Sequence, residues 1–241
     1  VSDASFERIR MLADQLDIPD HLHTHETAQE VVESQKKHGQ RPIARLDRLG
    51  LVNDRLIAVH MTQLTDAEIA LCAERGVSVV HCPESNLKLA SGFCPVAKLQ
   101  QAGVTLAIGT DGAASNNDLD MFGETRTAAL LAKAVADDAA TFDAAHALHA
   151  ATLGGARAMG LDELIGSVVP GKQADLALVD LGALETQPLH HVLSQVVYAT
   201  GRHQVSDVWV AGRAKLRNRV LVDLDEAALV ANARHWRERI G

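Results

Sequence analysis

The sequence predicts an α/β fold: half of a (β/α)8 barrel followed by part of a small β-sandwich domain. In the first two thirds of the chain, four short apolar runs alternate with helical segments, which implies parallel strands joined by crossover helices. Four such units are half of the eight that close a barrel. After Gly166 the helical pattern gives way to short strand-like runs separated by turn residues, which is typical of hairpins.

We divide the chain into three parts. Residues 1–165 are expected to form the second half of the barrel, residues 166–222 the small β domain, and residues 223–241 a C-terminal helix. The chain opens on Val1 and enters a predicted helix almost at once, so we expect it to be the C-terminal half of a longer polypeptide. Its 241 residues, 47% of them hydrophobic, are enough to bury a core.

Local patterns predict the elements of the barrel half in order. Apolar residues at helical spacing behind Ser2, a capping residue, indicate a first helix that ends at Leu16. Thr65 and Glu68 form a capping box for a later helix, which Gly76 ends. Strands are expected at residues 18–23, 56–59, 77–80 and 104–108, and further helices at 28–50 (interrupted by Pro42), 95–102, 119–136 and 142–159.

The last third of the chain is expected to form short strands and one helix. Residues 167–169 and 174–179 flank a Pro-Gly turn, and residues 205–210 and 214–222 flank the turn at 211–213. Residues 225–240 carry the spacing of an amphipathic helix. These elements predict the small β domain and the helix that ends the chain.

Composition excludes several classes of function. With a net charge of -8, 3% aromatic residues and no Lys/Arg cluster, the chain lacks the features of a nucleic-acid binder. It has no apolar run near the ~18 residues that span a bilayer and no secretory signal, so we expect no membrane partner and a cytoplasmic location. Cys72, Cys82 and Cys94 share no CxxC spacing, which argues against a disulfide framework. A small-molecule substrate is the prediction that remains.

Polar residues lie at the carboxyl ends of three predicted strands. His23 and Glu26 follow the first strand, His60 the second and Asp111 the fourth, where barrel enzymes place their active sites. Imidazole and carboxylate groups are the usual ligands of catalytic zinc, and a carboxylate three residues after a ligand can act in general acid/base catalysis. Each residue alone has a structural alternative: a core histidine, a cap or an Asp-Gly turn. Their joint placement favours a metal-dependent active site.

Other polar residues have two interpretations. His81 also ends a predicted strand, and it either faces the pocket or begins a plain β/α turn at Pro83. Ser115, Asn116 and Asn117 either hold a substrate or cap the helix that follows them. For the histidines at positions 146, 149, 190, 191, 203 and 235, surface exposure or helix packing is the favoured interpretation.

Three motifs resemble the amidohydrolase superfamily: HTHETA at 23–28, HCPESNLKL at 81–89 and GTDGAASNN at 109–117. Within it they most resemble the 5-methylthioadenosine/S-adenosylhomocysteine deaminases, whose chlorohydrolase relatives share much of the sequence of these motifs. GGARAMG at 154–160 and GKQADL at 171–176 fit the final barrel helix and the small β domain of that family. The resemblance covers essentially the whole chain, and the motif at 109–117 is its most specific part.

The resemblance implies a metal-dependent hydrolase barrel that binds one Zn²⁺ per full-length subunit. It makes His23 a metal ligand from the fifth barrel strand, and Asp111 the eighth-strand ligand that also serves as the base. It makes Glu26 the proton shuttle and His60 the sixth-strand histidine that orients the attacking water. The candidate substrate-contacting residues are Glu26, His60, Ser85 and Asn86.

One feature of the family is missing from this chain. Family members begin the barrel with a His-x-His pair on the first strand, which supplies two further metal ligands. His23 and His25 are not that pair, because the residues after them follow the order of the fifth, sixth and eighth strands. We therefore expect the pair in a preceding segment of the polypeptide.

The activity that the resemblance implies is hydrolytic deamination of the adenine ring of S-adenosylhomocysteine or 5′-methylthioadenosine. The products would be the inosine analogue and ammonia. The implied partners are a nucleoside substrate, the N-terminal half of the barrel and further copies of the subunit in a homo-oligomer. The alternatives are a related amidohydrolase that acts on another purine or on a chloro- or amino-triazine, and a non-catalytic half-barrel.

Overall fold

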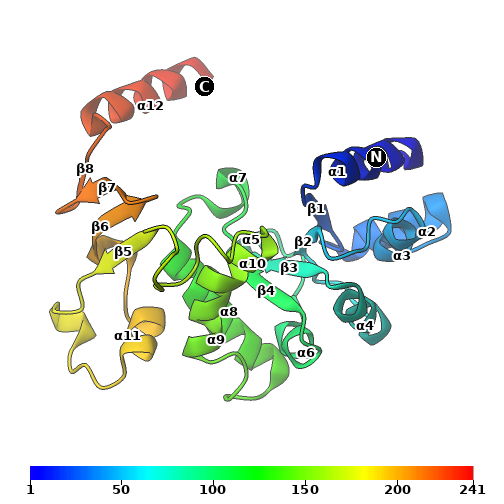
Figure 1. Ribbon diagram of the computed structural model, residues 1–241, viewed down its shortest axis with the longest axis horizontal. Coiled ribbons are helices and arrows are strands. Elements are labelled where there is room, and N and C mark those ends of the chain that lie inside the picture. The colour runs from blue at the N-terminus through cyan, green and yellow to red at the C-terminus, as the bar shows by residue number, and fades with distance from the viewer. Residues whose placement is uncertain (241) are drawn as a thin grey trace.

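Two separate four-stranded sheets organise the chain in the computed structural model, which describes residues 1–240 (Figure 1). The first sheet is parallel and the second antiparallel, so the predicted mixed α/β class is confirmed. The parallel sheet contains, in spatial order, β1 (Asp20–Thr24), β2 (Leu56–His60), β3 (Ser78–His81) and β4 (Thr105–Ile108). The antiparallel sheet contains, in spatial order, β5 (Leu176–Val179), β6 (Val205–Val210), β7 (Arg213–Arg217) and β8 (Val220–Leu221).

Strands of the parallel sheet follow one another in space as they do along the chain. The register pairs Thr24 with His60, and Val80 with both Val59 and Ala107. Because neighbouring strands run in the same direction, their carboxyl ends lie along one edge of the sheet. The residues that follow each strand therefore emerge close together.

The first four helices confirm the capping patterns. They are α1 (Asp3–Leu16), α2 (Ala28–His38), α3 (Pro42–Arg48) and α4 (Asp66–Arg75). The Ser2 side chain accepts a hydrogen bond from the backbone of Ser5, and both hydrogen bonds of the Thr65–Glu68 capping box are present. Gly76 ends α4 with a left-handed φ of 72°, a conformation that glycine adopts without steric strain.

Four helices follow β3 along the chain, up to residue 136. They are α5 (Pro83–Lys88), α6 (Val96–Gln101), α7 (Ala113–Asn116) and α8 (Met121–Ala136). The short helices α5 and α7 were not among the predicted elements. Leu56, Val79 and Leu106 of the sheet form one buried core with Ala128 and Ala129 of α8. The core therefore lies on the helix-covered face of the parallel sheet.

The helix predicted at 142–159 is divided in the structure. It comprises α9 (Ala144–His149), a π-helical segment (Ala150–Gly154) and α10 (Gly155–Ala158). A Cβ atom added at Gly154 would lie 2.2 Å from the backbone oxygen of Leu106 in β4. The wider π-helical turn therefore packs its backbone directly against the sheet, and only glycine fits at that position.

Two predictions for the last third are wrong, and one helix there was not predicted. Residues 167–169 form no strand: Val168 is 84% exposed, and the Val169 carbonyl closes a turn by accepting from Lys172. The strand predicted at 214–222 is broken between β7 and β8, where Asn218 and Arg219 adopt left-handed φ values of 46° and 64°. The sequence analysis also missed α11 (Val192–Tyr198), which contacts α8 and α9.

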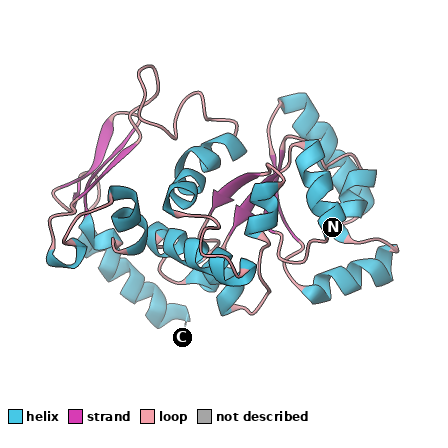
Figure 2. Cartoon of the chain, turned by 90° about the horizontal axis from the view of Figure 1, so that it is seen from below, coloured by secondary structure: helices cyan, strands magenta, loops and turns pink. Residues whose placement is uncertain are grey.

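The chain ends in α12 (Glu226–Ile240), and Gly241, the last residue of the predicted C-terminal segment, lies outside the described residues. No residue of α12 is buried, and the helix stands apart from the parallel sheet (Figures 1 and 2). Within residues 1–240, no helix has both the length and the apolar character needed to cross a membrane. The half-barrel, the β-sandwich and the three domain boundaries stay predictions.

Candidate active site

Three side chains surround one nitrogen atom of His60 at the carboxyl edge of the parallel sheet. From His60 Nε2, the distance is 3.1 Å to Nδ1 of His23, 3.8 Å to Oε2 of Glu26 and 4.0 Å to Oδ2 of Asp111. The four residues come from the ends of β1 and β2 and the loop after β4. The structure thus brings together the four residues that the sequence analysis assigned to metal binding and catalysis.

Backbone and side-chain hydrogen bonds fix the segment that carries Glu26. The backbone N–H groups of His25 and Glu26 donate to the Glu30 carboxylate at 3.1 and 2.7 Å. The Thr62 hydroxyl donates to the Glu26 carbonyl at 2.7 Å, and the Ser91 hydroxyl donates to the Glu26 carboxylate at 3.2 Å. Glu26 is thus held at both its backbone and its side chain.

His60 is fully buried and has a left-handed φ of 77° at the end of β2. This conformation is rare for residues other than glycine and clusters at functional sites. The ring is oriented by a 2.8 Å hydrogen bond from Nδ1 to Oδ1 of Asn86. Because an amide oxygen can only accept, Nδ1 carries the hydrogen of this bond, and Nε2 faces the other three residues.

Asp111 has the same kind of backbone conformation, with a φ of 61°. The hydroxyls of Ser85 and Ser115 both donate to its Oδ2, each at 2.7 Å. Burial alone would raise the pKa of Asp111, but the hydrogen bonds from Ser115 and Ser85 outweigh it and hold the pKa below its usual value. The site therefore contains an ionised carboxylate at neutral pH.

Ser85 and Asn86 lie in the protein interior, behind the residues at the centre of the site. They are 0% and 1% exposed, and their side chains bond to Asp111 and His60. The geometry gives both residues a supporting position behind the site, and the substrate contact assigned to them stays a prediction. Asn116 and Asn117 likewise bond to protein groups, the former to Glu124 and the latter to Lys88.

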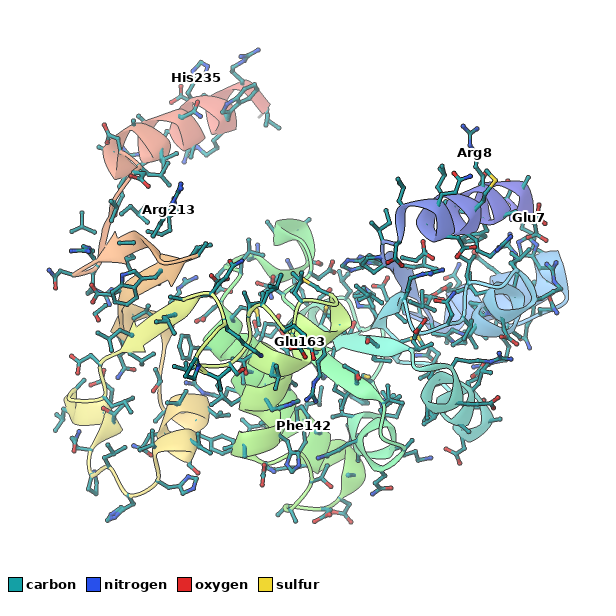
Figure 3. The ribbon with its side chains drawn as sticks, in the orientation of Figure 1. Glu7, Arg8, Phe142, Glu163, Arg213 and His235 are labelled. Carbon is teal, nitrogen blue, oxygen red and sulfur yellow. The ribbon has the colours of Figure 1, made fainter. Side chains whose placement is uncertain are left out.

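Two further histidines near the site belong to the interior. His25 is fully buried, its Nε2 accepts from the backbone of Ile43 at 3.0 Å, and burial lowers its pKa. His81 ends β3, and burial together with the nearby His60 lowers its pKa to about 3, so its ring is neutral. Neither ring nitrogen of His81 has a hydrogen-bond partner among residues 1–240. His235 lies on α12, away from the site (Figure 3).

The sequence analysis missed Ser91 and Glu30 as residues that hold the site. Ser91 follows α5 in a loop, and only the three-dimensional fold brings it to Glu26, 65 positions earlier in the chain. Glu30 has a local signal, because it lies in the first turn of α2 behind the capping residue Thr27. The supporting role of Asn86 has no signal beyond its place in the motif at 81–89.

A metal ion could be held at this edge of the sheet. One ligand atom from each of His23, Glu26 and His60 lies within 4.8 Å of the others. Asp111 is not part of that group, although its Oδ2 lies 4.0 Å from His60 Nε2, and it accepts hydrogen bonds from two serines. Two imidazoles with carboxylates form a nitrogen and oxygen donor set of the kind that binds zinc, so the residues fit that ion.

A cavity of about 480 Å³ lies beside His23, between β1 and the first three helices. Its walls include Leu22, Thr27, Lys37 and Arg45, and they do not include Glu26, His60 or Asp111. The cavity therefore opens next to the candidate active site and does not extend over its centre.

Comparisons with known proteins place this geometry in a family. A sequence profile of the amidohydrolase family matches residues 1–215. The whole chain is 51% identical to a 5-methylthioadenosine/S-adenosylhomocysteine deaminase from Teredinibacter turnerae, of which it covers 54%. A deaminase of the same name from Haloarcula marismortui is 45% identical over 88% of the chain, which covers 49% of that relative. The chain thus spans about half the length of the curated relatives it matches.

Solved structures share the fold over the whole chain. A zinc-bound adenosine deaminase from Xanthomonas campestris superimposes with a TM-score of 0.99 and 76% identity, covering 100% of this chain and 55% of its own. Atrazine chlorohydrolase from Arthrobacter aurescens TC1, complexed with zinc, has a TM-score of 0.92 and 26% identity, covering 97% of this chain and 52% of its own. The family profile and the identity to curated relatives together show that the chain belongs to the amidohydrolase family.

Proposed function

We propose that the polypeptide containing this chain deaminates the adenine ring of S-adenosylhomocysteine and 5′-methylthioadenosine by hydrolysis. The observation that carries this proposal is the convergence of His23, Glu26 and Asp111 on one nitrogen of His60. The names of the curated relatives support the choice of substrate, and the zinc-bound adenosine deaminase supports an adenine nucleoside as the substrate class.

In this proposal His23 and Asp111 hold a zinc ion. When bound, zinc lowers the pKa of a coordinated water molecule from 15.7 toward ~7 and so supplies a nucleophile at neutral pH. Catalytic zinc usually has three protein ligands, so a site with His23 and Asp111 alone needs at least one further ligand. The relatives are about twice as long as this chain, so we assign the missing ligands, and the other half of a closed (β/α)8 barrel, to chain outside these 241 residues.

The residues of this chain have separate tasks in the reaction. Asp111 accepts a proton from the attacking water, and His60 orients that water through the lone pair on Nε2. The water oxygen adds to C6 of the adenine ring while Glu26 delivers a proton to N1. Glu26, now a carboxylate, takes the proton of the new hydroxyl group on C6 and passes it to the departing amine. The C6–N bond breaks, a carbonyl forms at C6, and ammonia leaves instead of an amide ion. The proton that Asp111 accepted then returns to Glu26. The product is the inosine analogue.

A second candidate function follows from the chlorohydrolase structure, which shares the fold with a TM-score of 0.92. A triazine hydrolase would use a similar group of residues on a chloro- or amino-substituted ring. An identity of 26% over 97% of this chain is lower than that to the deaminases, so we place it second.

A substrate panel with the full-length polypeptide tests the proposal. Ammonia release is measured with S-adenosylhomocysteine, 5′-methylthioadenosine, adenosine and guanine, and chloride release with atrazine, each with and without a zinc chelator. We expect the first two to have the largest kcat/KM and the chelator to abolish turnover. Turnover of atrazine alone, or of no compound in the panel, would contradict the proposed function.

A further inference from the structure

Glu124 is a buried carboxyl group that the proposed reaction does not use. It lies in the first turn of α8 and is 0% exposed. Acidic side chains are rarely fully buried unless their oxygen atoms accept hydrogen bonds, and both oxygens of Glu124 do so. The carboxyl lies behind the candidate active site and does not touch its four central residues.

The two oxygens of Glu124 bond to two different short helices. The side chain of Asn116, the last residue of α7, donates to Oε1 at 2.5 Å. The backbone N–H of Glu84, in the first turn of α5, donates to Oε2 at 3.3 Å. Helix α5 contacts both α7 and α8, so the three helices form one cluster (Figure 1).

The same two helices carry the groups that orient the candidate catalytic residues. From α5, Ser85 donates to Asp111 and Asn86 bonds to His60. From α7, Ser115 donates to the same oxygen of Asp111 as Ser85 does. Helices of six and four residues do not persist alone in water, so their positions depend on the contacts that fix them.

We propose that Glu124 is a positioning residue that holds α5 and α7 in place and thereby fixes Asp111 and His60. The geometry of these contacts carries the inference, and its catalytic consequence rests on the proposed function. Glu124 acts only through Asn116 and the backbone of α5. Removing its carboxyl therefore leaves every group of the site present but less well fixed.

The protonation state of Glu124 suggests a conservative replacement. Burial raises the pKa of Glu124 to about 8, opposed by the hydrogen bond from Glu84 and reinforced by the charges of Glu84 and Asp118. Most molecules therefore carry a neutral carboxyl group at pH 7. Glutamine has nearly the same shape and is neutral, but only one of its two terminal atoms accepts a hydrogen bond, so Glu124→Gln should keep one of the two links to α5 and α7.

The test uses four variants of the full-length polypeptide. Glu124→Ala removes both links, Asn116→Ala removes only the link to α7, and Glu124→Gln keeps the shape of the side chain with one acceptor oxygen. Ala132→Gly is the matched control, because Ala132 is also buried on α8 and carries no group that can form the hydrogen bonds of Glu124. The readouts are amide hydrogen exchange at 83–88 and 113–116, the zinc affinity by chelator competition, and kcat.

We expect Glu124→Ala to speed amide exchange in both short helices by about tenfold or more. It should weaken zinc binding and kcat by about 10–100-fold, as removal of an outer supporting partner typically does. Glu124→Gln should lie between the unmodified protein and Glu124→Ala in all three readouts, because it keeps one acceptor oxygen. Asn116→Ala should speed exchange at 113–116 alone, and it remains informative if Glu124→Ala does not fold.

Equal exchange and zinc affinity in Glu124→Ala and Ala132→Gly would overturn the proposal, as would unchanged exchange at 113–116 in Asn116→Ala. Ammonia release by the unmodified polypeptide is measured alongside and tests the proposed function separately. If no adenine nucleoside is deaminated but Glu124→Ala still loosens both helices, the function fails and the positioning role stands. If deamination is observed and Glu124→Ala behaves like the control, the proposed function stands and the positioning role fails.

Discussion

The two sheets of this protein differ most in how they are covered. All five residues of β2 in the parallel sheet are buried, whereas no residue of β5 to β8 is buried in the described part of the chain. The candidate active site lies at the edge of the buried sheet. Within that sheet, His60 ends the fully buried strand β2, whereas His23 is an exposed residue of β1. The comparison teaches that the site joins a group fixed in the core to groups that are open to solvent, so packing can hold His60 in place while His23 stays accessible.

The largest expected effect is on the chemistry at the buried sheet. Glu26→Gln keeps the size of the side chain but cannot transfer a proton, so kcat in the full-length polypeptide should fall by about 10²–10⁴-fold. Metal content should be retained in this variant. His23→Ala should instead lower metal content and activity together, because it removes a proposed ligand.

His21 provides the control for these two variants. It lies two residues before His23 on β1 and is exposed, so His21→Ala should leave both metal content and kcat nearly unchanged. His25 is a poor control, because its ring is fully buried and its loss would disturb the core. Near-normal turnover by Glu26→Gln would show that the proton shuttle is wrongly assigned.

The stability of the two sheets should differ in the same direction as their burial. Leu56 in β2 is 0% exposed and Leu178 in β5 is 54% exposed. Leu56→Ala leaves a cavity and should lower the free energy of unfolding by about 2–5 kcal/mol, whereas Leu178→Ala should change it by less than about 0.5 kcal/mol. Chemical denaturation of the full-length variants measures both values. Equal losses would mean that the antiparallel sheet is buried against chain outside these residues.

Much of the parallel sheet could be predicted from the sequence. Apolar runs mark its four strands, and local caps such as Ser2, Thr65 and Gly76 mark helix ends, because these signals involve residues only a few positions apart. The sequence also indicated that His23, Glu26, His60 and Asp111 lie close together, since each lies at or just after a strand end, and their roles stay predictions. In all these cases the signal lies in residues close together in the sequence, so no knowledge of the fold was needed to predict the feature.

The features that the sequence did not predict depend on distant contacts. The π-helical segment exists because Gly154 lies against the backbone of β4, and no local pattern encodes that approach. The absence of a strand at 167–169 has a related cause, because a strand needs a partner that only the fold can supply. Ser91 bonds to Glu26, which lies 65 positions away in the sequence, and Glu124 bonds to the backbone of Glu84, which lies 40 positions away.

A smaller effect is expected on the pH dependence of stability. The pKa of Glu124 is raised by burial to about 8 in the folded protein, above the ordinary value near 4.5 in the unfolded chain. Between these values the unfolded chain binds fewer protons, so this group lowers stability as the pH rises. Glu124→Gln should remove that contribution and lose less stability than the unmodified protein between pH 5 and pH 8. Parallel stability curves for the two proteins would contradict the assignment.

The smallest expected effect concerns the exposed end of the chain. Because α12 has no buried residue, its amides should exchange with solvent well before those of α8, whose inner face is buried. Leu229→Ala on α12 should leave the melting temperature unchanged within about a degree. Protection of α12 equal to that of α8 in the full-length polypeptide would reveal a covering partner.

The central claim is that residues at the carboxyl edge of the parallel sheet bind a catalytic zinc ion. Anomalous X-ray diffraction from crystals of the full-length polypeptide, recorded on both sides of the zinc absorption edge, tests it directly. We predict one zinc ion per subunit, with a His23 nitrogen at about 2.0–2.1 Å and an Asp111 oxygen at about 2.0–2.2 Å. A zinc-loaded crystal in which the ion lies away from both residues would contradict the account.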